Sequence, residues 1–198
     1  MAGNVILWSG GADSTLLLMR EIKATGTAKA ISVNHWHCGS VDADRIARAR
    51  IKAILTARGV KIDHSEVSVR YDKRRVPEYH GMIQAAIWLG AVIPHLGHNP
   101  TLHCGYIRGD DFWHHRQDWV YAWTYLGAIM GWDAAAFQFP LEWNSKAEVL
   151  KELRTHGMLS RVEFCQYSKV DRKSQKVTRC RECVSCEKHY DALRKIRG

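Results

Sequence analysis

The residues near the amino terminus that are best suited to chemistry form a glycine turn, Ser9-Gly10-Gly11-Ala12-Asp13-Ser14-Thr15. Two glycines let the backbone approach an anion closely, and the hydroxyl side chains of the turn can donate hydrogen bonds to it. The turn follows an apolar run, residues 4–8, and opens an amphipathic segment. It therefore joins a buried strand to the start of a helix, where backbone amides lack partners, and we expect it to bind phosphate.

The glycine turn lacks two common phosphate-binding patterns, G-x-x-x-x-G-K-[ST] and G-x-G-x-x-G. A second nucleotide contact is expected where the next strand ends in Asn34 and His35. Loops at the carboxyl ends of parallel strands face the ligand crevice, so these side chains should meet the adenine or the ribose. His35, His37 and Cys38 could instead bind a metal, although closely spaced histidines in such loops more often pack or form hydrogen bonds.

Two further loops carry charged and aromatic side chains that could bind a substrate. Arg75 and Tyr79 lie in the loop after the third expected strand, where a solvated surface loop is an equal alternative. The loop after the fourth expected strand has paired carboxylates, Asp110 and Asp111, which could hold magnesium. Its cationic side chains could bind a carboxylate or a phosphate; they include Arg108, His115 and Arg116. A salt-bridged surface loop is the alternative.

Lys146 stands at the start of an expected helix, where Ser145 and Glu148 have the spacing of a capping box. A lysine in the first turn of a helix opposes the helix dipole. We therefore expect Lys146 to meet an anion rather than to be a tolerated surface residue.

Four of the six cysteines fall near the carboxyl terminus, at Cys165, Cys180, Cys183 and Cys186. This C-x2-C-x2-C spacing with one more distant cysteine fits a single tetrahedral metal site, for which zinc is the expected ion. An iron–sulfur cluster is the alternative, because ferredoxin patterns begin in the same way. Disulfides are disfavoured in a chain without a secretion signal. The metal should be structural and should anchor the loop of residues 166–179 and the last helix.

Alternating apolar strands and helices predict an α/β fold with a doubly wound, mostly parallel five-stranded sheet. Strands are expected at residues 4–8, 29–34, 61–69, 101–107 and 135–141, and helices at residues 15–22, 42–58, 82–96, 118–130, 145–157 and 185–196. The third strand alternates polar and apolar residues, which places it near an edge. Aromatic side chains of the fourth helix are expected in the core, with a dimer interface as the alternative. Residues 1–160 should form a nucleotide-binding domain and residues 161–198 a zinc-binding segment.

The net charge of +9 is concentrated near the carboxyl terminus, because residues 165–198 carry ten Lys or Arg against four Asp or Glu. Nucleic acid could bind this segment, although metal-bound thiolates would cancel part of the charge and a solvated basic face explains it as well. The sequence has no apolar run of membrane-spanning length, and its first residues lack the basic region and cleavage site of a secretion signal, so we expect no leader. We expect a cytoplasmic protein with no membrane partner.

The S-G-G-x-D-S turn resembles the pyrophosphate loop (PP-loop) of the ATP pyrophosphatase superfamily. Three more motifs occur in the order typical of 7-cyano-7-deazaguanine synthases: Val76-Pro77, the run from Pro140-Leu141 to Lys146-Ala147-Glu148, and the four cysteines. Together they make residues 5–189 similar to that family. The resemblance implies an adenine nucleotide alpha hydrolase-like fold, a structural zinc and usually a homodimer. It also implies synthesis of 7-cyano-7-deazaguanine from 7-carboxy-7-deazaguanine, ammonia and ATP with magnesium.

In the reaction that this resemblance implies, the substrate carboxylate is adenylated, ammonia attacks to give an amide, and a second activation dehydrates the amide to the nitrile. The residues expected to hold the leaving phosphates are Ser9, Gly10, Gly11, Asp13 and Ser14. Lys146 would neutralise developing charge, and Asp110 lies in a G-x4-D motif of the family. The chain departs from the family at residues 78–80 and 112–118, which belong to the substrate loops. The product could therefore be the nitrile or the amide, and the pathway could modify tRNA or DNA.

Two other classes of function fit the same residues. One is a different PP-loop enzyme that acts on tRNA, by thiolation or lysidine formation, or on a sulfated nucleotide. Such an enzyme would use an active-site thiol, for which Cys38 and Cys104 are the candidates. The other is a non-catalytic module that binds nucleotide or nucleic acid through its basic carboxyl-terminal segment, with steep salt dependence.

Overall fold

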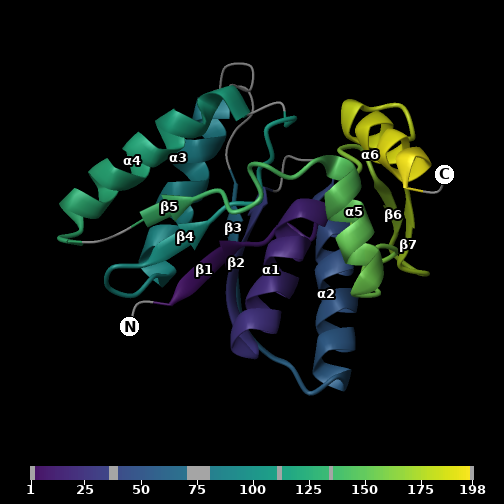
Figure 1. Cartoon of the computed structure of the whole chain (residues 1–198), viewed down its shortest axis with the longest axis horizontal. Coiled ribbons are helices and arrows are strands. Elements are labelled where there is room, and N and C mark those ends of the chain that lie inside the picture. Colours follow the sequence, from purple (N-terminus) through teal and green to yellow (C-terminus); the bar gives the residue numbers. More distant parts are fainter. Residues whose placement is uncertain (1–2, 36–39, 71–80, 111–112, 134–135, 197–198) are drawn as a thin grey trace.

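A parallel sheet of five strands lies at the centre of the molecule. The computed structural model describes residues 3–35, 40–70, 81–110, 113–133 and 136–196. The strands are β1 (Asn4–Leu7), β2 (Thr27–His35), β3 (Lys61–Val69), β4 (Thr101–His103) and β5 (Ala136–Gln138). Their order is β3-β2-β1-β4-β5, and all four neighbouring pairs are parallel (Figure 1). The predicted α/β class, the parallel sheet and the edge position of β3 are confirmed.

Helices cover both faces of this sheet. They are α1 (Ala12–Thr25), α2 (Val41–Ala57), α3 (Gly81–Val92), α4 (Arg116–Ile129), α5 (Lys146–Thr155) and α6 (Val184–Lys195), with short 3-10 turns at Ile93–His95 and Trp113–His115. Helices α1, α2 and α5 lie on one face and α3 and α4 on the other (Figure 1). The chain builds β1, β2 and β3 outward and then returns to place β4 on the other side of β1. Ligands of parallel sheets bind at such a switch in strand order.

The side chains of β1 explain why its sequence is apolar from Val5 to Leu7. Ile6, with Trp8 just after the strand, packs into the core under α1, α2 and α5. Val5 and Leu7 pack into the opposite core under α3 and α4. Both faces of the strand are therefore buried from Val5 to Leu7, whereas Asn4, at its half-buried first position, donates a hydrogen bond to Glu21 at 3.1 Å.

The aromatic residues of α4 divide between the core and the surface. Trp119 and Trp123 are 0% and 1% exposed, whereas Tyr121 and Tyr125 are 66% and 69% exposed. Residues two apart on a helix point in different directions, while those four apart share a face. The prediction of core positions is therefore confirmed for the two tryptophans and wrong for the two tyrosines.

The carboxyl-terminal segment is more ordered than the sequence indicated. Strands β6 (Lys169–Asp171) and β7 (Lys176–Thr178) form an antiparallel pair within the stretch expected to be a loop, so that expectation was wrong. The carboxylate of Asp171 closes the turn by accepting hydrogen bonds from the backbone amides of Lys173 and Ser174. Arg50 of α2 donates to the carbonyl of Gln175 at 3.0 Å, which holds the pair against the body. The predicted division at residue 160 remains a prediction.

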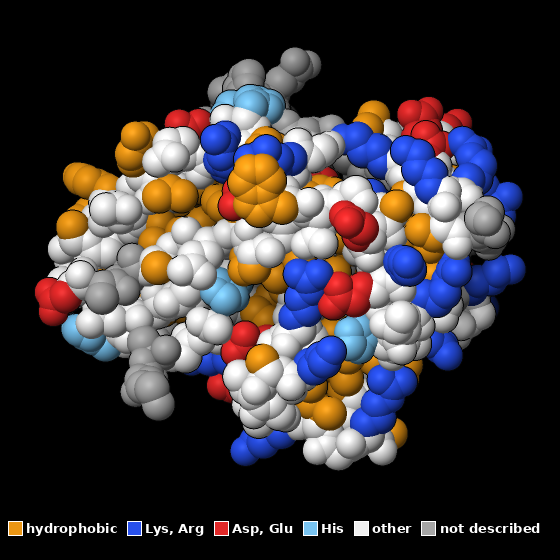
Figure 2. All heavy atoms as spheres, viewed as in Figure 1, with side chains coloured by type: hydrophobic (Ala, Val, Ile, Leu, Met, Phe, Trp, Pro, Cys, Tyr) orange, Lys and Arg blue, Asp and Glu red, His pale blue; other side chains and the backbone are white. Residues whose placement is uncertain are grey.

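The surface of the molecule shows where its basic side chains gather. Lys and Arg side chains crowd the side that carries α6, β6 and β7 (Figure 2). This agrees with the excess of basic residues between positions 165 and 198. Among the described residues, no helix is both long and apolar enough to span a membrane.

Candidate nucleotide site and metal centre

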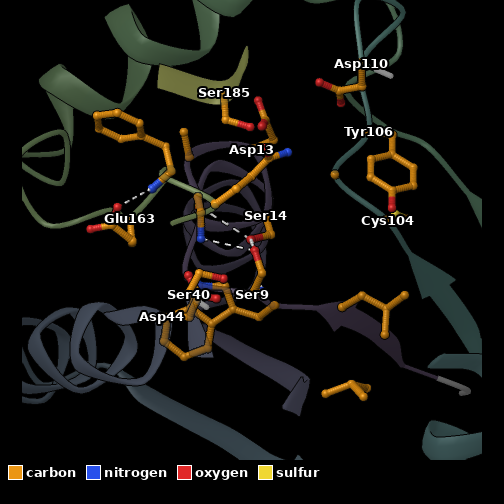
Figure 3. A pocket seen from close by; sticks show the side chains of 18 of the residues that line it. Ser9, Asp13, Ser14, Ser40, Asp44, Cys104, Tyr106, Asp110, Glu163 and Ser185 are labelled. Atoms are coloured by element: carbon orange, nitrogen blue, oxygen red, sulfur yellow. Dashed lines mark hydrogen bonds between the residues drawn. The ribbon is translucent and has the colours of Figure 1, made fainter. Parts of the chain in front are cut away.

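A cavity of about 280 Å³ opens at the carboxyl ends of β1, β2 and β4. Its walls come from the glycine turn, from the segment after β4, from the first turn of α5 and from the carboxyl-terminal segment (Figure 3). Of the predicted site residues, Ser9, Gly11, Asp13, Ser14, Asp110 and Lys146 line it. Segments far apart in the sequence therefore meet at the place where a parallel sheet binds its ligand.

The glycine turn is held by its own hydroxyl groups. Ser9 donates its backbone amide to Ser14 Oγ at 3.2 Å, and Gly11 donates its amide to Ser9 Oγ at 3.1 Å. Gly11 is the N-cap of α1 and offers no side chain to cap it. Gly10 has a φ of 93°, and a Cβ there would lie 2.9 Å from the carbonyl oxygen of Asp44. Glycine is required at position 10, and the uncapped amino terminus of α1 suits an anion.

Arg48 of α2 holds this turn in place by a hydrogen bond to its backbone, and the sequence interpretation did not select this residue. Its side chain is 2% exposed and donates to the carbonyl of Ser9 at 2.8 Å and to Asn34 Oδ1 at 2.6 Å. Glu66 accepts from both Arg48, at 3.3 Å, and Asn34, at 3.1 Å. Asn34 therefore holds Arg48 and does not line the cavity. The available signal was an arginine on the buried face of a helix, between Ala47 and Ile51.

Gly105 allows the end of β4 to lie against the start of α1. A Cβ at this position would stand 2.8 Å from the amide nitrogen of Ser14 and 2.9 Å from the carbonyl carbon of Asp13. A side chain would therefore push the two segments apart. Their close approach brings Asp110, five residues further on, into the same cavity as Asp13.

Asp13, Asp110 and Lys146 form a charged cluster in the cavity. Lys146 donates a hydrogen bond to Asp13 Oδ2, whereas Asp13 Oδ1 is buried and has no partner among the described residues. Burial raises the pKa of Asp110 to about 6, with a further contribution from the charge of Asp13. Burial disfavours the charged form of Lys146, but the neighbouring carboxylates outweigh it and raise the pKa of that lysine. The orphaned oxygen and the crowded carboxylates suit a divalent cation.

Asp44, Trp88 and Tyr106 also line the cavity, and the sequence interpretation did not select them. Burial raises the pKa of Asp44 to about 7, although its hydrogen bond with Ser40 opposes the rise. Trp88 and Tyr106 each contact Trp119 edge to face, at ring separations of 5.8 Å. They form an aromatic wall on the side of α3 and α4, against which a planar ring could pack.

Two predicted nucleotide contacts near the glycine turn lie elsewhere. Thr15 is fully buried, and its hydroxyl accepts a hydrogen bond from Trp8 Nε1 at 3.1 Å. His35 is buried and meets the ring of Trp88 edge to face at 5.8 Å. Neither side chain lines the cavity, because each points into a packed core beside it.

The cationic residues of the second loop also do not line the cavity. Arg108 stacks on Trp143, its Cζ 3.3 Å from the ring centre, and Arg116 lies over Trp113 at 5.1 Å. His115 Nδ1 is 3.1 Å from Asp118 Oδ2. The structure therefore does not bring these side chains to Asp110. Arg75, Tyr79 and Asp111 lie outside the described residues, as do His37 and Cys38.

The start of the carboxyl-terminal segment is attached directly to the glycine turn. Glu163 donates its backbone amide to the carbonyl of Gly10 at 3.0 Å. Its buried carboxylate accepts from the amides of Phe164 and Cys165 at 3.0 and 2.9 Å and forms an ion pair with Arg179. These contacts place the segment along one wall of the cavity.

The four cysteines converge on one point. The Sγ atoms of Cys165, Cys180, Cys183 and Cys186 all lie within 4.8 Å of one another. Four thiolates around one zinc ion at 2.3 Å stand about 3.8 Å apart, and the cysteines therefore fit one such ion. An iron–sulfur cluster would separate at least some of them more, because its four thiolates are spread over two or four irons. Cys183 caps α6 and Cys186 lies in its first turn, where the helix dipole favours thiolates. The cluster could hold a metal such as zinc.

Cys104 is the described candidate for an active-site thiol. It is completely buried at the end of β4 and lines the cavity. Burial raises the pKa of Cys104 to about 12, so the thiol is protonated at neutral pH. A protonated thiol is a poor nucleophile.

No protein-family model matches this chain, and no curated protein matches it. The cavity and the cysteine cluster are therefore the basis on which a function can be proposed.

Proposed function

We propose that this chain is a PP-loop enzyme that uses ATP and magnesium to convert 7-carboxy-7-deazaguanine and ammonia into 7-cyano-7-deazaguanine, or into the corresponding amide. The observation that carries the proposal is the meeting of the glycine turn with Asp13, Asp110 and Lys146 in one cavity. That set offers amide donors for phosphate, carboxylates for a divalent cation and an ammonium for developing charge. The nearby cysteine cluster matches the expected structural zinc.

The proposed reaction needs no side-chain nucleophile. An oxygen of the substrate carboxylate attacks the α-phosphorus, the bond to the β-phosphate oxygen breaks, and pyrophosphate leaves. Ammonia then attacks the acyl carbon, loses a proton and displaces AMP. A second ATP activates the amide oxygen in the same way, and loss of AMP and two protons leaves the nitrile. The protein contributes orientation and charge stabilisation.

Each part of the cavity has a task in this scheme. The turn of Ser9, Gly11 and Ser14 holds the phosphates, and Lys146 neutralises the negative charge that grows on the leaving group. Asp13 Oδ1 and Asp110 would hold magnesium, which would supply positive charge to the phosphate oxygens. The aromatic wall of Trp88 and Tyr106 suits the planar deazapurine. The proposal includes a homodimer, for which the exposed tyrosines of α4 offer an apolar surface.

The proposal is tested by mass spectrometry of products formed from ATP, magnesium, ammonium and 7-carboxy-7-deazaguanine. The expected result is the nitrile or the amide, together with AMP and pyrophosphate. Asp13→Ala should abolish the products, because it removes the partner of Lys146 and the orphaned oxygen. Asp63→Ala, at an exposed position on edge strand β3, is the matched control and should keep full activity.

The alternatives predict different outcomes of the same experiment. An enzyme acting on tRNA or on a sulfated nucleotide would leave the deazapurine untouched and release pyrophosphate only with its own substrate. The high pKa of Cys104 disfavours a mechanism in which that thiol is the nucleophile. A non-catalytic module would bind ATP without releasing pyrophosphate. Either result would refute the proposed synthesis.

A further inference from the structure

Helix α6 presents one face to the core and another to the cavity. Cys186, His189 and Ala192 are buried, at successive spacings of three residues. Ser185 and Lys188 are also three residues apart, and both line the cavity. Figure 3 shows Ser185 on the same side of the cavity as Asp13. The helix therefore adds a hydroxyl and an ammonium to the lining of the cavity.

The ammonium of Lys188 has a defined place beside the charged cluster. Its Nζ donates to the carbonyl of Gly109 at 2.9 Å, and this carbonyl belongs to the residue before Asp110. The positive charge of Lys188 also acts on the carboxylate of Asp110 and favours its ionised form. The hydrogen bond joins the carboxyl-terminal helix to the loop after β4.

Positive charge is scarce in this cavity. Among the described residues that line it, Lys146 and Lys188 are the two cationic side chains. Lys146 forms an ion pair with Asp13, and Lys188 donates to the carbonyl of Gly109. The same walls carry four acidic side chains, which are Asp13, Asp44, Asp110 and Glu163. A bound triphosphate brings several more negative charges. Magnesium at Asp13 and Asp110 would neutralise part of that charge, and Lys188 is the second cationic side chain available for the rest.

The cysteine cluster determines where this face of α6 lies. Cys183 caps the helix and Cys186 lies in its first turn, so two of the four expected metal ligands flank Ser185. Cys165, a third ligand, itself lines the cavity. An ion bound by these cysteines would fix the first turn of α6 against the cavity wall.

We infer that Lys188, with Ser185, binds the terminal phosphates of the nucleotide, and that the four-cysteine metal centre positions them. This inference rests on the proposed use of ATP at the same cavity. Lys188 is thus assigned as a phosphate-binding residue. It lies near the carboxyl terminus, whereas the glycine turn lies near the amino terminus. The metal centre is then part of the nucleotide site as well as a support for the fold.

The test compares the affinities of ATP and AMP by calorimetry with magnesium present. Lys188→Gln removes the charge but retains a donor for the carbonyl of Gly109. It should weaken ATP binding about tenfold, which is about 1.4 kcal/mol, and change AMP binding less than about twofold. Lys188→Arg should keep the ATP affinity within about threefold. Lys195→Gln, at an exposed position of the same helix, is the matched control and should change neither affinity.

The outcomes separate this inference from the proposed function. If the wild-type protein binds neither nucleotide, the proposed function fails. If the wild-type protein binds ATP and Lys188→Gln keeps the wild-type ratio of ATP to AMP affinity, the inference is overturned. An equal loss of ATP and AMP affinity would also overturn the inference, because the loss of a purely structural lysine would disturb the binding of both nucleotides. Metal content, measured by elemental mass spectrometry, should stay at one ion per chain in all variants.

Discussion

The buried carboxylates of the cavity lower the free energy of unfolding of the protein when no ligand is bound. Asp13 uses one oxygen to accept from Lys146, while the other is buried with no partner among the described residues. Burial raises the pKa of both Asp44 and Asp110. Buried charges of the same sign destabilise the empty protein, and a bound cation relieves them. This pattern is typical of a binding site and unusual in a purely structural core.

Asp110→Asn should make the protein relatively more stable at neutral pH and should also weaken its binding of magnesium and ATP. The pKa of Asp110 is raised from 3.8 to about 6, so the folded protein holds this proton more tightly than the unfolded chain does. The stability that the protonated carboxyl contributes is present below about pH 4 and is lost as the pH rises through about 6. The charged side chains that face Asp110 are Asp13, Lys146 and Lys188. They are present in the wild type and in Asp110→Asn alike.

Thermal unfolding without nucleotide, from pH 4.5 to 8, measures this effect. The melting temperature of Asp110→Asn relative to the wild type should rise over this range and level off above pH 7. The same variant should bind magnesium and ATP more weakly than the wild type. A difference in melting temperature that does not change with pH would contradict the assignment of a raised pKa to Asp110.

At the scale of elements, two local features position the charged groups. The capping box of α5 is present, with Ser145 accepting from the amide of Glu148 and Glu148 accepting from the amide of Ser145. It fixes the first turn of the helix and therefore the backbone position of Lys146. The close approach of Gly105 to α1 fixes the other half of the cluster. A change at either element should therefore act on the charged cluster in the cavity.

Gly105→Ala should damage both folding and nucleotide binding. The added methyl group would meet backbone atoms of Ser14 and Asp13 at under 3.0 Å, and backbone cannot move aside as a flexible side chain can. We expect a loss of about 1–3 kcal/mol in the free energy of unfolding, together with weaker ATP binding. Urea unfolding and calorimetry measure the two effects.

Gly90→Ala is the matched control for this substitution. Gly90 lies in α3, and a Cβ there meets nothing within 4 Å. Alanine is the better helix former, so this variant should be as stable as the wild type or up to about 1 kcal/mol more stable. Equal effects of the two substitutions would show that the approach of β4 to α1 is not tight.

At the scale of the whole molecule, the carboxyl-terminal segment closes the structure onto its beginning. Glu163 donates a hydrogen bond to the carbonyl of Gly10, and Lys188 donates one to the carbonyl of Gly109. Ala192 packs in the same hydrophobic core as α1 and α5. The cysteine cluster lies between these attachments. A metal bound there would therefore link the last helix to the glycine turn.

Removal of the metal should loosen this segment selectively. A chelator, or Cys183→Ser, should increase hydrogen exchange in α6, β6 and β7 while β1 and α1 stay protected, because the latter lie in the main core. ATP affinity should fall at least as far as in Lys188→Gln. Exchange mass spectrometry with elemental analysis measures this; unchanged exchange after loss of the metal would show that the cluster does not hold the segment.

Short-range patterns in the sequence were sufficient for several of these features. The strand, turn and helix around Gly10, the capping box at Ser145 and the spacing of the cysteines are each set by residues that are close in the chain. Local preferences and hydrophobic periodicity determine them, so the class of the fold and a possible metal centre could be predicted.

Only the tertiary structure decided which distant residues share the cavity. Lys146 is 133 positions from Asp13, Lys188 is 79 from Gly109, and Arg48 is 39 from Ser9. Such contacts depend on strand order and on how each helix is rotated against the sheet, which local preferences do not encode. For the same reason Arg108, His115 and Arg116 looked like site residues in the sequence but pack elsewhere. The sequence by itself determined the chemical groups, and packing decided which of them meet.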